Sequence, residues 1–167
     1  MSDSPGTPRT LGILAGGGRI PGQVAAAAEA AGRTVFIVGL EGFAERSVIG
    51  AWKHEIIRIG AVGRILAALR THGCQDVVLI GKVRRPSIFD LRPDAVATKM
   101  IARVGRAAFS GDDGLLAAVI KVLGEEGFLV IGAHDIRNAA RGPSGLLTQA
   151  APDAQAMADI ERGVAVA

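Results

Sequence analysis

The chain has 167 residues, of which 49% are hydrophobic and 21% charged, so it can form one domain with a buried core. Its net charge is only +3, and it contains no Tyr and five Phe. We therefore expect no nucleic-acid partner, because such proteins use a basic surface and stacking aromatic side chains. The single cysteine, Cys74, excludes an internal disulfide and a cysteine zinc site. We expect it to be a buried structural thiol.

The N-terminal segment, residues 1–9, is rich in Ser, Pro and Thr and lacks the apolar stretch of a signal peptide. We expect a disordered tail here and a cytoplasmic protein. The first apolar run, residues 11–15, leads into Gly16, Gly17 and Gly18 and then into Pro21. Glycine allows a sharp turn and brings backbone N–H groups close to a ligand, and the following helix N-terminus favours an anion. The pattern predicts a phosphate-binding loop, although its spacing matches neither Walker A nor G-x-G-x-x-G, so a plain tight turn is the alternative.

Apolar runs and helical patterns alternate along the rest of the chain. Helices are expected over residues 22–31, 62–71, 93–108 and 112–126, and strands over residues 34–38, 54–59, 76–80 and 128–131. Alternation at these lengths predicts right-handed βαβ crossovers. The expected fold is α/β, a Rossmann-like parallel sheet flanked by helices at residues 10–133, with a linker and C-terminal helix at residues 134–167. No acidic residue ends the strand 34–38, which disfavours an NAD(P)-dependent oxidoreductase.

A cationic loop follows the strand 76–80 and contains Lys82, Arg84 and Arg85. Open α/β sheets bind ligands at the carboxyl ends of their strands. These cations would neutralise a diphosphate that also rests on the glycine loop, and the alternative is a solvated basic loop.

Two acidic pairs offer further candidates. Asp112 and Asp113 stand at a helix start, where Asp caps the helix, although paired carboxylates also hold Mg²⁺. His134 and Asp135 follow the last strand, where an acid/base role and a structural role are both open. The spacing of His54 and His72 builds no zinc site.

With these residues in view, the chain resembles the N-terminal part of the LpxI-type UDP-2,3-diacylglucosamine pyrophosphatases of bacterial lipid A synthesis. The resemblance rests on residues 11–18 with Ile20 and Pro21, and on residues 81–86, 111–116, 126–128, 132–134 and 157–160. The matches occur in the same order and span nearly everything after Arg9.

The resemblance implies hydrolysis of the diphosphate of UDP-2,3-diacylglucosamine to UMP and 2,3-diacylglucosamine 1-phosphate, with Mg²⁺ or another divalent metal. It implies substrate contacts from Gly16, Gly17, Gly18, Lys82, Arg84, Asp112 and Asp113, and assigns neither the catalytic base nor the metal ligands. Such enzymes hold the lipid nucleotide between this domain and a C-terminal domain that we expect to be absent from this chain.

Several alternatives follow from the same residues. A stand-alone nucleotide-binding or regulatory module without chemistry fits the cationic loop equally well. The sequence shows no pattern typical of an acyl-length groove. An apolar stripe through Met157, Ile160 and Val164 indicates a partner surface, such as a homo-oligomer. Peripheral contact with the inner membrane is a further expectation.

Overall fold

The computed structural model describes residues 9–84, 92–104, 112–136 and 153–166. The chain divides into two compact units, Met1–Arg137 and Asn138–Ala167. Apart from Arg9, the tail expected at residues 1–9 lies outside the described residues. The second unit contains helix α7 (Ala154–Val166), whose Met157 and Ile160 side chains are exposed.

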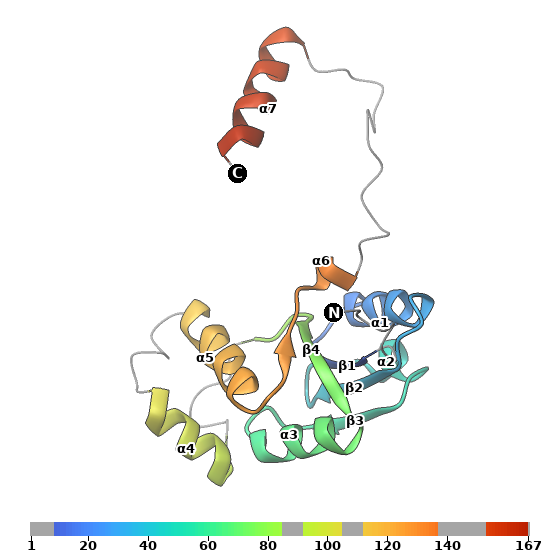
Figure 1. The fold of residues 1–167 in the computed structure, drawn as a ribbon, viewed down its shortest axis with the longest axis vertical. Helices are drawn as coiled ribbons and strands as arrows, with labels where there is room; N and C mark the ends of the chain where they lie inside the picture. The colour runs from blue at the N-terminus through green and yellow to red at the C-terminus, as the bar shows by residue number, and fades with distance from the viewer. Residues whose placement is uncertain (1–8, 85–91, 105–111, 137–152, 167) are drawn as a thin grey trace, which may run out of the picture. The chain divides into compact units, whose positions relative to one another are not determined.

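The first unit is built on a five-stranded sheet in which every pairing is parallel (Figure 1). The strand order is β3-β2-β1-β4-β5. The strands are β1 (Thr10–Ala15), β2 (Val35–Leu40), β3 (His54–Ile57), β4 (Cys74–Ile80) and β5 (Leu129–Val130). The expected Rossmann-like parallel sheet is confirmed. Strands β2 and β3 follow β1 on one side of it, and β4 and β5 lie on its other side. The strand order therefore reverses between β1 and β4. Open parallel sheets bind their ligands at this reversal point.

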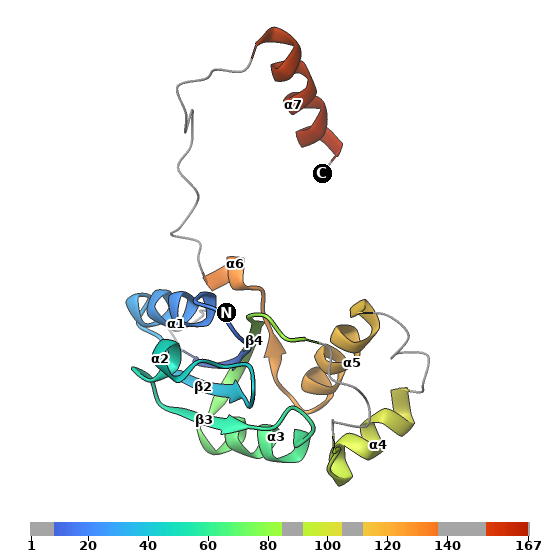
Figure 2. The same cartoon turned by 180° about the vertical axis from the view of Figure 1, so that it is seen from behind.

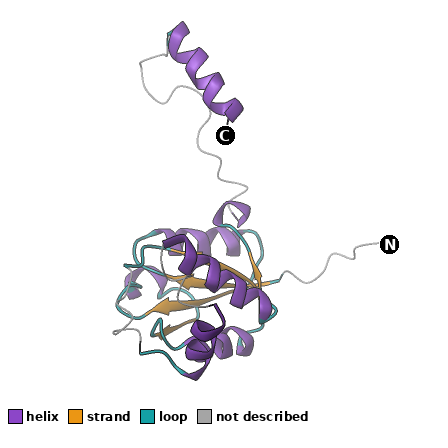
Figure 3. Ribbon diagram, turned by 90° about the vertical axis from the view of Figure 1, so that its left-hand side faces the viewer, coloured by secondary structure: helices purple, strands orange, loops and turns teal. Residues whose placement is uncertain are grey.

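Helices cover both faces of this sheet (Figures 2 and 3). They are α1 (Ile20–Ala30), α2 (Arg46–Ile49), α3 (Val62–Thr71), α4 (Ala95–Val104), α5 (Asp112–Glu125) and α6 (Ala133–Ile136). Among the described residues, no helix combines the length and apolar character needed to cross a membrane.

The strands bury side chains on both faces, as the continuous apolar runs predict. On one face, Leu11 and Ile13 of β1 pack with Val24 and Ala28 of α1. On the other, Leu14 belongs to a cluster with members from α3 and α5. The two clusters fix β1 and β4 from both sides, so the loops at their carboxyl ends start from a rigid base.

Asp94 sets the start of α4, which begins at Ala95 rather than at the expected residue 93. Its carboxylate accepts a hydrogen bond from the Ala97 amide at 2.7 Å and another from the Gly63 amide at 2.8 Å. Asp94 therefore caps α4 and ties it to the first turn of α3. Residues 105–108 of the expected helix lie outside the described residues.

Asp76 is the buried charged residue of the described core, with 5% of its surface exposed. Its carboxylate forms ion pairs with Arg33 and, at 3.3 Å, with Arg9. Arg33 also donates from Nε to the Arg9 carbonyl oxygen at 3.0 Å. These partners satisfy the carboxylate near the amino end of β4, at the opposite edge of the sheet from the cationic loop.

Replacing Asp76 by Asn should therefore destabilise the protein by about 2–3 kcal/mol, because charged hydrogen bonds are lost and the half-buried Arg33 is left unpaired. Urea unfolding would measure the change. The control is Glu125→Gln, which removes an exposed pair with Lys121 at 4.0 Å and should cost less than about 0.5 kcal/mol. Equal losses in the two variants would contradict the structural role of Asp76.

Candidate functional site

The glycine loop and the cationic loop, at residues 16–18 and 81–84, meet at the carboxyl edge of the sheet. The Gly17 amide donates to the Lys82 carbonyl oxygen at 2.9 Å, and the Lys82 amide donates back to Gly17 at the same distance. The Gly16 amide donates to the Ile80 carbonyl oxygen at 2.8 Å. The sequence predicted that the two loops share one edge, and the structure joins them directly at the point where the strand order reverses.

This junction depends on missing side chains. A Cβ atom on Gly16 would lie 2.7 Å from the Lys82 carbonyl oxygen and 2.8 Å from the Val83 Cγ2 atom. Gly81 has φ +104°, and a Cβ atom there would lie 2.8 Å from the Gly16 carbonyl carbon. Both positions require glycine, because any larger residue would force the backbones of the two loops apart.

The amides of the glycine loop form hydrogen bonds within the protein, so the contact of this loop with a ligand stays a prediction. Gly16 and Gly17 donate to backbone carbonyls, and Gly18 donates to the Glu45 carboxylate at 3.2 Å. The backbone N–H groups that lack an intrahelical partner are those of the first turn of α1, as at any helix start. An anion at this loop would thus meet the helix N-terminus and would compete with Glu45 for Gly18.

Glu45 was missed by the sequence analysis. It lies just before α2, with an extended backbone, and reaches the glycine loop from the segment that follows β2. It lines an open hollow of mixed polar and apolar character beside the N-terminus of α1, together with Arg19, Gly22, Gln23, Ala26, Ser47, Val48 and Trp52. The sequence pattern did not single it out, because Rossmann-type proteins carry their ribose-binding acidic residue at the end of the second strand, and Glu45 lies beyond that point.

Lys82 and Arg84 are exposed. Within the part of the chain that the structure describes, no carboxylate lies within ion-pair distance of either side chain. The described surroundings of these cations thus leave them accessible to an anion at the loop junction. Arg85 lies outside the described residues.

Helix α5 begins at Asp112, as the sequence predicts, with Asp113 next. The side chains of both residues lie outside the described part, so the choice between capping and metal binding stays a prediction. In the described part, no group of three or more His, Cys, Asp or Glu side chains is placed to hold a metal ion.

His134 and Asp135 stand on the short helix α6 and are exposed. His134 Nε2 lies 3.2 Å from Asp135 Oδ1, while Asp135 Oδ2 accepts from the Gly132 amide at 3.0 Å. Asp135 therefore holds the turn after β5, and the acid/base role of this pair stays a prediction. Cys74 is buried as expected, and burial raises the pKa of its thiol to about 11, so it is a poor nucleophile at neutral pH.

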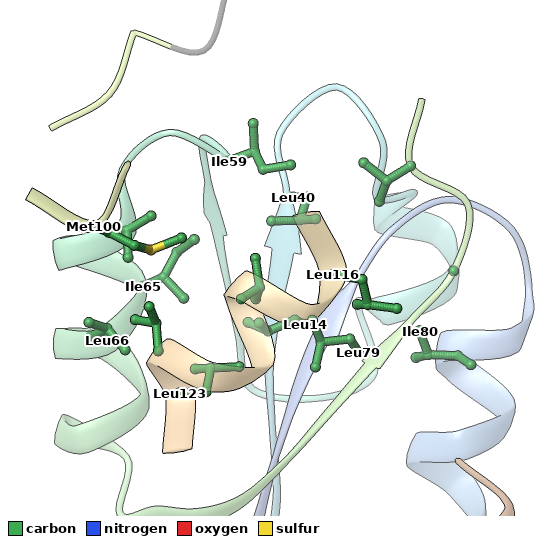
Figure 4. A pocket seen from close by; sticks show the side chains of 15 residues that line it. Leu14, Leu40, Ile59, Ile65, Leu66, Leu79, Ile80, Met100, Leu116 and Leu123 are labelled. Atoms are coloured by element: carbon green, nitrogen blue, oxygen red, sulfur yellow. The ribbon is translucent and has the colours of Figure 1, made fainter. Parts of the chain in front are cut away.

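An apolar cavity of about 580 Å³ opens beside the loop junction (Figure 4). Its walls come from the sheet and from three helices, and the sequence analysis did not foresee it. The lining residues are Leu14, Leu40, Ile59, Val62, Ile65, Leu66, Leu79, Ile80, Gly81, Val83, Met100, Leu116, Val119, Val122 and Leu123. The sequence showed no pattern that indicates this cavity, because its lining residues are scattered along the chain.

Comparison with known proteins gives one family. The LpxI N-terminal domain model matches residues 10–139. The UDP-2,3-diacylglucosamine pyrophosphatase LpxI of Caulobacter vibrioides is 38% identical over 159 residues, which are 95% of this chain and 56% of that protein. The chain thus spans about half the length of this relative. Among solved structures, the chain is similar to a UDP-glucose-4-epimerase from Stenotrophomonas maltophila with bound NAD and formylated UDP-arabinopyranose. The two are 18% identical, with a TM-score of 0.47, and the match covers 74% of this chain and 36% of the epimerase.

The close packing of the loop junction predicts opposite effects for two Gly→Ala substitutions. Gly16→Ala should destabilise the protein by about 1–3 kcal/mol, because its methyl group overlaps the Lys82 carbonyl oxygen and the Val83 side chain. Gly124→Ala, in α5 with nothing within 4 Å of the added atom, should stabilise it by about 0.5 kcal/mol. Urea unfolding of both variants is the measurement, and a neutral Gly16→Ala would show that the loops do not need this contact.

Proposed function

The chain belongs to the LpxI family, and on that premise we propose that it is the nucleotide-holding part of a hydrolase of lipid A synthesis. The reaction is cleavage of the diphosphate of UDP-2,3-diacylglucosamine, which gives UMP and 2,3-diacylglucosamine 1-phosphate. The Caulobacter relative is a UDP-2,3-diacylglucosamine pyrophosphatase, and we propose the same substrate for this chain. Action in the cytoplasm, with peripheral contact with the inner membrane, is part of the proposal.

The observation that carries the proposal is the junction of the glycine and cationic loops. Gly17 and Lys82 exchange two backbone hydrogen bonds between the ends of β1 and β4. This is the crevice in which open α/β sheets bind their ligands. The exposed Lys82 and Arg84 flank it, so a diphosphate placed here would meet two cations and the N-terminus of α1.

Glu45 fits the hydroxyl-bearing parts of the same ligand. An ionised carboxylate only accepts hydrogen bonds, so it repels phosphate and favours ribose or sugar hydroxyls. Its hydrogen bond with the Gly18 amide supports a position beside the proposed diphosphate. We propose that Glu45 positions a hydroxyl of the nucleotide when the ligand displaces it from Gly18.

The proposal includes a divalent metal, which would polarise the phosphoryl oxygens and lower the pKa of a bound water. The described side chains do not form a cluster that fits such an ion. The two candidate carboxylates, Asp112 and Asp113, lie where side chains are not described. We therefore derive no step through a metal, and assign no residue as the base for the attacking water.

The first test is calorimetric titration of this chain with UDP-2,3-diacylglucosamine, followed by a hydrolysis assay of the same sample with Mg²⁺. Binding together with release of UMP would support the full proposal. Binding without turnover would support the nucleotide-holding role and leave the chemistry to residues beyond this chain. If the ligand did not bind, the proposal would be wrong.

The cationic loop makes a more specific prediction. Lys82→Ala and Arg84→Ala should each weaken binding of the lipid nucleotide about tenfold, because a charged hydrogen bond at an exposed site contributes about 1.5 kcal/mol and 1.4 kcal/mol is tenfold in affinity. The matched control is Lys53→Ala, because Lys53 is also exposed but lies just before the amino end of β3, at the opposite edge of the sheet. Titration of all three variants checks the prediction. Equal affinities for Lys82→Ala, Lys53→Ala and the unmodified chain would remove Lys82 from the site.

A further inference from the structure

Helix α4 is joined to α3 at its first turn. The Asp94 amide donates to the Gly60 carbonyl oxygen at 3.0 Å, and its carboxylate Oδ2 accepts from the Gly63 amide at 2.8 Å. The other carboxylate oxygen, Oδ1, accepts from the Ala97 amide at 2.7 Å and so caps α4. Within the described residues, the hydrogen bonds between α4 and other elements all involve Asp94. One residue therefore both begins α4 and holds it against the start of α3.

Beyond this joint, the described side chains of α4 are packed shallowly. Ala97 is buried, but Val96 is 39% exposed, and Met100 and Ile101 are each partly exposed. Met100 lines the apolar cavity, and Figure 4 shows it at one side of the cavity with Ile80 at the other. A helix with polar contacts at one end and few buried side chains elsewhere is free to swing about the held end.

The opposite wall of the cavity is fixed more firmly. Arg70 of α3 pairs with the Glu126 carboxylate, just after α5, and its guanidinium lies 5.9 Å from the centre of the Phe128 ring. Leu123 of α5 is buried, as is Phe128. Helix α5 is thus held at its carboxyl end by an ion pair and by core packing together, so α4 is the wall that is able to move.

The rim of the cavity gives this motion a direction. Val83 and Leu116 both line the cavity and are 41% and 49% exposed, although both are large hydrophobic residues. A swing of α4 toward them would bury apolar surface on both sides, which is favourable. We propose that α4 is a lid on the apolar cavity and that the bonds of Asp94 to the start of α3 are its hinge. The proposal concerns the domain itself and does not depend on the substrate proposed above.

The test measures how often the cavity side of α4 meets water. Met100→Cys introduces a thiol there, whose reaction with N-ethylmaleimide at neutral pH is followed by mass spectrometry. Cys74 serves as the slow internal reference, because it is buried and its pKa is raised to about 11. When opening and closing are fast, the labelling rate follows the population of the open state.

Asp94→Ser, added to Met100→Cys, separates the hinge from the helix cap. Ser caps a helix as well as Asp does, but it offers one oxygen, so it keeps the bond to Ala97 and loses the bond to Gly63. We expect labelling to become about tenfold faster, the effect of losing one hydrogen bond to a charged group. Circular dichroism and urea unfolding check that the variants are folded.

Gly63→Ala reaches the same joint from the side of α3. The added Cβ atom would lie 2.9 Å from the Val96 Cγ2 atom and 3.1 Å from Asp94 Oδ2, so it should push α4 away and speed labelling. Ala also favours the helix more than Gly does, so faster labelling would not come from a weaker α3. The matched control is Gly124→Ala in α5, where nothing lies within 4 Å of the added atom and the rate should stay the same.

Asp76→Asn distinguishes a swing of α4 from unfolding of the whole domain, since it weakens the core at the other edge of the sheet. If it accelerated labelling as much as Asp94→Ser, the thiol would become exposed only on global unfolding and α4 would not be a lid. If neither Asp94→Ser nor Gly63→Ala changed the rate, the joint would not be a hinge.

A second arm tests closure, with the neutral fluorescent dye N-phenyl-1-naphthylamine as an apolar probe of the cavity. A lid that closes over the dye should slow labelling of the Met100→Cys thiol about tenfold at a dye concentration ten times its Kd. Asp94→Ser should weaken dye binding. Unchanged labelling with dye bound would show that α4 does not close. If the dye did not bind, there would be no chamber for a lid to cover, and the proposal would be wrong.

Discussion

The close approach of Gly16 to Gly81 is the constraint on which the candidate site depends. Strands β1 and β4 run parallel and in register up to Ala15 and Ile80, so they end at the same level of the sheet. Beyond these strands, the two loops come so close together that neither Gly16 nor Gly81 has room for a Cβ atom. Because of this contact, the cationic loop lies beside the glycine loop. The two paired residues, Gly17 and Lys82, are 65 positions apart in the sequence.

The distribution of charge over the sheet separates structural from functional groups. At its amino edge, the buried Asp76 is satisfied within the protein by Arg33 and Arg9. At its carboxyl edge, Lys82 and Arg84 are exposed, and the described residues provide no acidic partner. The core on both faces holds the two ends rigidly, so the accessible cations mark the edge at which a negative ligand is expected.

The sequence predicted the sheet well because its strands are short apolar runs separated by helical patterns of sufficient length. It also predicted that the loops after β1 and β4 share an edge, since this follows from parallel pairing alone. It could not predict that Glu45 meets Gly18, because side-chain partners across 27 positions depend on how the α2 segment folds back. The apolar cavity was missed for the same reason, as residues from Leu14 to Leu123 form its walls. The roles of Asp112 and Asp113 are still predictions.

A lipid-linked nucleotide has one charged centre between a polar and an apolar end, and the described site has the same order. The loop junction stands between the hollow that contains Glu45 and the cavity that contains Val83 and Leu116. If the proposed diphosphate lies at the junction, the charged and polar side chains near α2 favour the nucleoside on that side, and the apolar residues of α3 and α5 favour the acylated sugar on theirs. The reverse orientation would place alkyl chains against Glu45 and Arg19 and leave the cavity facing uridine, and burying charged groups against alkyl chains without compensation is costly. Polarity alone therefore favours this orientation for the proposed substrate, before any catalytic residue is assigned.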